Sequence, residues 1–172
     1  GGAAFLDFDN VGFIDIYTCN GTWIEGFSKS EKPKKMPQNH LYKNMQDGTF
    51  KKLTKDSGLD DFSYSMGVTV ADYNNDGFSD IYLSNYGENI LYKNNGDGTF
   101  SDVTNTANVS GGNRCSVGAV WFDYDNDGLL DLYVGNYLNF DPEYNYYYAP
   151  DGFPGPLAYD SQPDILYRNN KL

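Results

Sequence analysis

Three short acidic segments place side-chain oxygen atoms at regular intervals along the chain: residues 7–15, 72–80 and 123–131. Each follows the pattern Asp-x-Asp/Asn-x-Asp-Gly-x-x-Asp, apart from Val11 at position 5 of the first segment. Calcium takes roughly six to eight oxygen ligands at about 2.3–2.6 Å, and a chain that turns sharply at glycine can direct alternate side chains and one carbonyl to a single point. The spacing therefore predicts a calcium site in each segment. We call the segments the first, second and third acidic loops.

The predicted ligands are the side chains at positions 1, 3, 5 and 9 of each loop and the backbone carbonyl at position 7. Because Val11 has no side-chain oxygen, we rank the sites third, second, first, and we expect two to three bound calcium ions. The ligand sets are Asp123, Asp125, Asp127 and Asp131 with the carbonyl of Leu129; Asp72, Asn74, Asp76 and Asp80 with the carbonyl of Phe78; and Asp7, Asp9 and Asp15 with the carbonyl of Phe13.

The ion is expected to be structural. Close carboxylates repel one another, so binding would order each loop and stabilise the fold. Ten of the 24 acidic residues lie in the loops, and three calcium ions would halve the formal charge of −12. The alternative is a set of solvated turns without metal, which are common in β proteins. An EF-hand or dockerin loop is rejected because position 12 is Thr18, Leu83 or Val134 rather than an acid, and the flanks alternate as strands.

The acidic loops belong to longer repeats. Residues 2–20, 67–85 and 118–136 share one template, and each copy is followed by a Leu-Tyr-Lys/Arg-Asn motif, which leads twice into Asp-Gly-Thr-Phe. The loops begin 65 and 51 residues apart. The shorter period is close to the length of a four-stranded propeller blade. The shared motifs are Leu41–Asn44, Asp47–Phe50, Leu91–Asn94, Asp97–Phe100 and Leu166–Asn169.

Alternation and turn residues predict the strands of one repeat. We expect strands near residues 67–72, 80–85, 89–94 and 99–104, with a hairpin turn at 95–98. The fold class is therefore all-β: a β-propeller segment of three four-stranded antiparallel blades, the last blade incomplete because its final strand is missing. The alternative is a sandwich of unrelated hairpins. The expected blades are residues 1–65 with a basic insert at about 21–39, 66–115, and 116–172 with a Tyr- and Pro-rich insert at about 137–163.

Such a segment has too few blades to close a ring, since propellers typically use about four to eight. We expect it to be part of a longer propeller, or to be completed by neighbouring copies. The excess of 24 acidic over 12 basic residues argues against nucleic acid as a partner. No apolar run approaches the roughly 20 residues of a membrane span. Cys19 and Cys115 set no disulfide framework, and we expect no bond between them.

On its acidic loops and its Leu-Tyr-Lys/Arg-Asn and Asp-Gly-Thr-Phe motifs, the chain resembles the FG-GAP and VCBS repeat family. This family supplies the calcium-loop blades of integrin α-chain propellers and of many bacterial secreted proteins. The motif combination is similar to the bacterial branch found beside ASPIC/UnbV domains. The resemblance implies a β-propeller, calcium as cofactor, and an extracellular, cell-surface or periplasmic location.

The inserts are the places to look for a ligand surface. The first holds Lys29, Lys32, Lys34 and Lys35, and the second holds Tyr137, Tyr144, Tyr146, Tyr147, Tyr148 and Tyr159. Exposed tyrosines can stack on sugars or form a protein interface. The alternatives are a solvated basic loop, and an aromatic insert that folds over its own blade.

The expected function is an extracellular calcium-binding repeat module that serves protein or glycan interaction, adhesion or structural assembly. Its rivals are a calcium-dependent carbohydrate-active enzyme resembling polysaccharide lyases, and a lectin-like binder. We expect no enzyme, because His40 is the one histidine and no serine or cysteine nucleophile motif surrounds it.

Overall fold

The computed structural model describes residues 1–23, 31–139 and 156–170. Within them the chain is all-β, with antiparallel strands and only short helices, in agreement with the expected fold class. No helix in these ranges is long and apolar enough to cross a membrane. The strands are β1 (Ala3–Leu6), β2 (Asp15–Thr18), β3 (His40–Asn44), β4 (Phe50–Lys52), β5 (Tyr64–Ala71), β6 (Asp80–Gly87), β7 (Ile90–Asn94), β8 (Phe100–Asp102), β9 (Arg114–Phe122), β10 (Asp131–Asn136) and β11 (Ile165–Tyr167).

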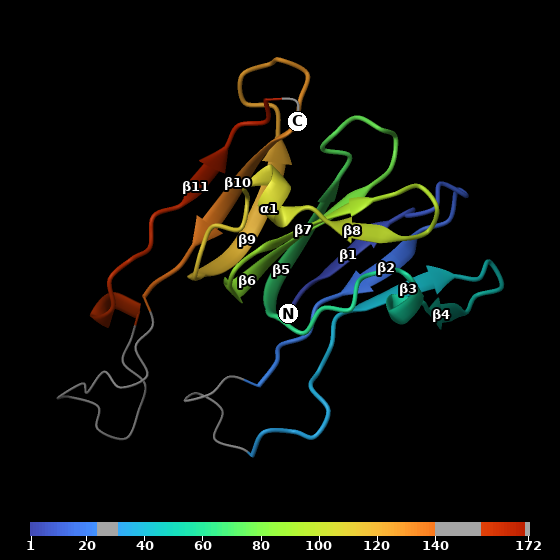
Figure 1. The fold of residues 1–172 in the computed structure, drawn as a ribbon, viewed down its shortest axis with the longest axis horizontal. Coiled ribbons are helices and arrows are strands. Elements are labelled where there is room, and N and C mark those ends of the chain that lie inside the picture. Colours follow the sequence, from blue (N-terminus) through green and yellow to red (C-terminus); the bar gives the residue numbers. More distant parts are fainter. Residues whose placement is uncertain (24–30, 140–155, 171–172) are drawn as a thin grey trace.

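Consecutive strands pair with one another, and they form three successive groups that we call the first, second and third units (Figure 1). The first unit is the sheet β1-β2-β3-β4, and the second has the order β5-β6-β7-β8. The third contains β9, β10 and β11 in the described residues. In each unit an acidic loop joins the first strand to the second.

The second and third units are not separate sheets. Residues Tyr86 and Gly87 at the end of β6 pair with Cys115 and Arg114 at the start of β9, so the two units form one seven-stranded sheet. The physical reason is an unused strand edge. Because β7 pairs with β6 only over Ile81–Leu83, the end of β6 keeps backbone groups free for a second partner.

Apolar side chains pack between the units rather than within one. The first core lies between the first and second units, where Phe8 and Phe100 have ring centroids 6.3 Å apart. The second core lies between the second and third units, where the Trp121 ring stacks on Tyr73 at 5.9 Å. The buried residues of the first core are Leu6, Phe8, Tyr17, Cys19, Leu41, Leu59, Ile81, Leu83, Tyr92 and Phe100, and those of the second are Tyr82, Leu91, Val109, Leu132 and Val134.

The strands of the second unit lie close to the expected ranges, except that the fourth is shorter than 99–104. It ends at Asp102, because the Asp102 carboxylate accepts hydrogen bonds from the Thr104 amide (3.0 Å) and hydroxyl (2.6 Å). That local turn begins the short helix α1 (Thr104–Ala107) in place of further strand. Short 3₁₀ turns occur at Thr54–Asp56 and Pro156–Ala158.

A buried asparagine of β7 joins the first two units. The Asn94 side-chain amide donates to the Phe8 carbonyl of the first unit (2.8 Å) and to the Ser79 carbonyl of its own unit (3.2 Å). Its counterpart Asn44 donates to the Ile14 carbonyl within the first unit (3.1 Å). The two residues therefore differ in the bond that crosses between units.

We predict that Asn94→Ala lowers the free energy of unfolding by about 1–3 kcal/mol more than the matched Asn44→Ala, because it leaves the Phe8 carbonyl buried without its donor. Urea unfolding of both variants measures the difference. Equal losses would show that the bond between the units contributes nothing.

Candidate metal centre

The three acidic loops share one backbone conformation. The asparagine at position 4 and the glycine at position 6 both have positive φ, which Asn tolerates and Gly adopts without steric cost. These two residues let the chain reverse within a few residues. The φ angles are 53°, 57° and 59° for Asn10, Asn75 and Asn126, and 88°, 91° and 86° for Gly12, Gly77 and Gly128.

The aspartate at position 1 closes each turn. In the second loop the two Asp72 carboxylate oxygens accept hydrogen bonds from the amides of Asp76 (3.0 Å) and Gly77 (2.8 Å). Asp7 and Asp123 make the same pair of bonds in the other loops, at 2.7–3.1 Å. The loop backbone therefore orients this carboxylate in all three loops.

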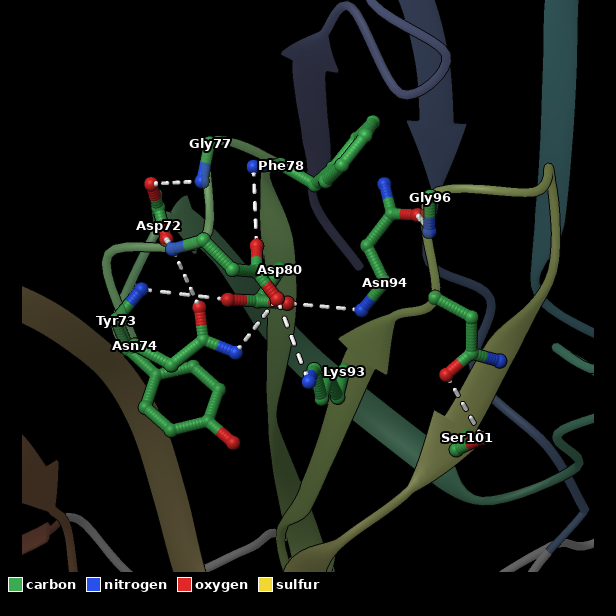
Figure 2. Close-up of polar contacts among 12 residues, drawn as sticks. Asp72, Tyr73, Asn74, Gly77, Phe78, Asp80, Lys93, Asn94, Gly96 and Ser101 are labelled. Carbon is green, nitrogen blue, oxygen red and sulfur yellow. Dashed lines mark hydrogen bonds and ion pairs between the residues drawn. The ribbon is translucent and has the colours of Figure 1, made fainter. Parts of the chain in front are cut away.

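The aspartate at position 9 is buried and joins the loop to the third strand of its unit. Figure 2 shows Asp80 between Tyr73 and Asn94, whose backbone amides donate to its two oxygens at 3.2 and 2.8 Å. Asp15 and Asp131 accept the equivalent pairs of bonds at 2.8–3.2 Å. All three side chains are at most 1% exposed. One of the two backbone amides that bond each position 9 carboxylate therefore belongs to the asparagine of the Leu-Tyr-Lys/Arg-Asn motif.

Two of the loops gather three carboxylates each, from positions 1, 3 and 9. Oxygens of Asp7, Asp9 and Asp15 lie within 4.8 Å of one another, and so do those of Asp123, Asp125 and Asp131. Asp9 and Asp125 each have one buried oxygen, Oδ1, with no hydrogen-bond partner. A buried carboxylate oxygen without a partner is costly unless a cation binds it. These two clusters can hold a metal ion.

The second loop has an amide at position 3 instead of a carboxylate. The Asn74 amide nitrogen donates to Asp76 Oδ2 (2.9 Å), and its oxygen accepts from the Asp76 amide (3.0 Å) (Figure 2). Asp72 and Asp80 keep the positions of their counterparts in the other loops. At positions 1, 3 and 9 this loop therefore has two carboxylates, one fewer than the first and third loops, and its polar groups at positions 3 and 5 bond one another.

Position 5 does not join the carboxylate clusters. Asp127 Oδ1 instead accepts from the amide of Leu129 (2.9 Å), and Asp76 Oδ1 accepts from the amide of Phe78 (3.1 Å). Val11 cannot make this bond, but the first loop still assembles its three carboxylates. The predicted roles of Asp76 and Asp127, and of the carbonyls of Phe13, Phe78 and Leu129, stay predictions.

A basic residue in the third strand, or directly after it, neutralises part of the charge of each loop. Lys43 pairs with Asp9, Lys93 Nζ lies 3.3 Å from Asp76, and Arg168 lies 2.7 Å from Asp125. All three cations come from the third position of the Leu-Tyr-Lys/Arg-Asn motif. The sequence predicts the motif but not this role. The signal for the role is a basic residue at a fixed place in a motif that recurs after every acidic loop.

The asparagine at position 4 reaches the loop of the next unit. Asn10 donates to the Gly77 carbonyl of the second loop (2.8 Å), and Asn75 donates to the Gly128 carbonyl of the third (3.2 Å). These contacts were not predicted from the sequence. They join the first acidic loop to the second and the second to the third, each by one hydrogen bond.

Burial raises the pKa of two position 9 carboxyls, Asp80 and Asp15. It brings the pKa of Asp80 to about 7, although the two backbone amide donors lower it and the nearby carboxylates of Asp76 and Asp72 raise it further. The pKa of Asp15 is also raised by burial, partly offset by its amide donors. A cation beside these groups would favour their charged form.

Other predicted features lie away from the loops. His40 begins β3, and its Nε2 lies 3.1 Å from Lys52 Nζ. Cys19 and Cys115 are buried free thiols, and burial raises the pKa of Cys19 to about 11. Lys32 lies over the Trp23 ring, 5.6 Å from its centroid. The insert residues Lys29, Tyr144, Tyr146, Tyr147 and Tyr148 lie outside the described residues.

Comparison with known proteins agrees with this geometry. No curated protein matches the chain. The sequence model of the FG-GAP-like repeat family matches residues 7–83 and 72–134, and the two matches together include all three acidic loops. They span more than half of the chain. The chain therefore belongs to the FG-GAP-like repeat family.

Proposed function

We propose that the chain is a calcium-binding module whose ions order the acidic loops and hold successive units together. The observation that carries the proposal is the pair of buried carboxylate oxygens without partners, Asp9 Oδ1 and Asp125 Oδ1, each inside a three-carboxylate cluster. The backbone fixes two members of each cluster before any ion binds, through the bonds at positions 1 and 9. The ligands are thus preorganised.

The donor set favours calcium over transition metals. Both clusters consist of carboxylates alone, without histidine or cysteine, and hard oxygen ligands suit calcium or magnesium. A short, glycine-turned loop adapts to the irregular coordination of calcium more readily than to the strict octahedron of magnesium. A bound calcium ion would supply two positive charges, which offset the repulsion among the carboxylates. In this proposal the second loop binds more weakly than the first and third, since it has one carboxylate fewer at positions 1, 3 and 9. The proposal thus reverses the order of the first and second sites that was predicted from the sequence.

The arrangement of units supports a propeller segment. The first strands of the three units lie side by side, with β5 in contact with both β1 and β9 (Figure 1). Apolar cores fill the spaces between successive units, as expected for neighbouring blades. In this proposal the blades are residues 1–65, 66–115 and 116–172.

The module serves interaction or assembly outside the cell and does not act as an enzyme. Membership of the FG-GAP-like repeat family supports a role in protein interaction. Calcium is abundant outside cells, where weak sites of this type would remain occupied. The carboxylates that could serve as acids or bases lie in the loops and are committed there to backbone amides and to the proposed ion. The partner is a protein or a glycan.

The first test is a calorimetric titration of the chelator-treated chain with Ca²⁺. We predict saturable binding of two to three ions and a rise in melting temperature. Asp125→Asn and Asp9→Asn should each remove one binding event, because each replaces the carboxylate with the unpartnered oxygen. Asp47→Asn is the matched control, since Asp47 lies in an exposed turn outside the loops. Absence of saturable binding in the unmodified chain would refute the proposal.

The second test concerns Lys43, the basic residue of β3 that pairs with the first loop. Lys43 pairs with Asp9, so its ammonium group competes with a bound cation. We predict that Lys43→Met strengthens calcium binding at this loop by about tenfold, the size expected for removing a unit charge some 5 Å from a divalent ion in a watery environment. Titration of the variant, with Lys52→Met as the control, measures the change. Unchanged or weaker binding would contradict the competition.

The third test uses the pKa of Asp80. Because the pKa of about 7 in the folded chain lies above the unfolded value of about 4, ionisation of Asp80 destabilises the metal-free fold as pH rises from about 4 to 7, with little change above that. We predict that this group lowers the free energy of unfolding by about 2 kcal/mol between pH 5.5 and 8 in chelator. Urea unfolding should show this slope in the parent chain and a flatter one in Asp80→Asn. Equal pH dependence of the unfolding free energy in the two chains would contradict the assignment of this effect to Asp80.

A further inference from the structure

The outer surface of the third unit carries an apolar face whose counterparts in the first unit are buried. We call it the tail face. Its five side chains are between 37% and 50% exposed, whereas the equivalent side chains of the first unit are at most 8% exposed beneath the second unit. The tail-face residues are Val120, Phe122, Tyr124, Tyr133 and Leu166, and their respective counterparts are Ala4, Leu6, Phe8, Tyr17 and Leu41.

The first unit has the complementary surface, which we call the head face and define by Phe5 and Phe50. These side chains are 66% and 46% exposed. Their counterparts in the second unit, Val70 and Phe100, pack in the first core against the first unit. Phe100 contacts the ring of Phe8 there. The head face is thus equivalent to the surface of the second unit that covers the first unit within this chain.

The polar contacts between units have matching groups on the two faces. Within the chain, position 4 asparagines donate to the glycine carbonyl of the next loop, and Asn94 and Asn169 donate back to Phe8 and Tyr73 carbonyls. On the tail face, the equivalent donor is Asn126, which is exposed. On the head face, the equivalent groups are the Gly12 carbonyl and the Asn44 amide. Each face therefore holds one half of both bonds.

We propose that the tail face of one chain binds the head face of a second copy. In this contact Tyr124 packs on Phe50, Asn126 donates to the Gly12 carbonyl, and Asn44 donates to the Tyr124 carbonyl. The contact repeats the two interfaces already present between the units. A second copy is the occupant because its head face has, at each equivalent position, the kind of residue that these interfaces use. Such an interface is heterologous, so copies assemble into rings or open chains rather than symmetric dimers.

The test uses one blocked variant for each face, measured by sedimentation velocity from about 1 to 500 µM. Tyr124→Lys blocks the tail and Phe50→Lys blocks the head, and both residues are exposed, so each variant should keep the parent fold by circular dichroism. Leu157→Lys, at another fully exposed apolar residue, is the control. The unmodified chain and the control should associate in a concentration-dependent manner, and each blocked variant alone should remain monomeric.

Mixing the two blocked variants gives the decisive result. One has a free head and the other a free tail, so the mixture should form a one-to-one dimer and nothing larger. A monomeric parent chain across the whole range, or a mixture that stays monomeric, would overturn the proposal. A dimer lost in one variant but retained in the other would indicate a symmetric contact and overturn it as well. The measurement is made with and without Ca²⁺, so its outcome is separate from that of the calcium titration.

Discussion

The buried carboxylate at position 9 of each acidic loop is the interaction on which the remaining structure depends. Asp80 is almost inaccessible to solvent, and its two oxygens accept backbone amides from the loop and from β7. It therefore fixes the loop, the start of the second strand and the end of the third strand with one side chain. Burying a charge in this position is costly, and the raised pKa of Asp80 expresses that cost. A cation beside the carboxylate offsets it.

The same constraint links local order to the packing of units. The first two loops are each bonded to the next loop through the asparagine at position 4, and the second and third units are bonded back to the previous unit through Asn94 and Asn169. The apolar cores lie between the units that these bonds connect. Under the proposed function, an ion that ordered one loop would therefore also stabilise the neighbouring core. Through these bonds a small, highly charged loop would influence the stability of a whole repeat.

Local features of the fold could be predicted from the sequence, because they depend on nearby residues. The positions of the strands followed from alternation, and the turns followed from asparagine and glycine at fixed offsets, such as Asn75 and Gly77. The grouping of Asp123, Asp125 and Asp131 followed from their spacing. These inferences needed only the geometry of a strand and a turn.

Contacts between distant residues could not be predicted in the same way. The pairing of β6 with β9 depends on how two units lie against one another, and the sequence of either strand does not indicate it. The hydrogen bond from Asn10 to Gly77 and the ion pair between Lys43 and Asp9 likewise join residues that lie far apart in the sequence. The amide that each position 5 carboxylate accepts two residues later was also not predicted, because the spacing of acidic residues does not show which carboxylate oxygen a loop amide takes. The ligand role of Asp76 and Asp127 stays a prediction.

The most direct test of the account is a crystal structure of the chain grown with calcium, with the ions located by anomalous scattering. The account predicts ions in the first and third loops, about 2.3–2.6 Å from Asp9 and Asp125 oxygens, with Lys43 and Arg168 displaced from those carboxylates. Loops that keep both ion pairs and contain only water at saturating calcium would contradict it.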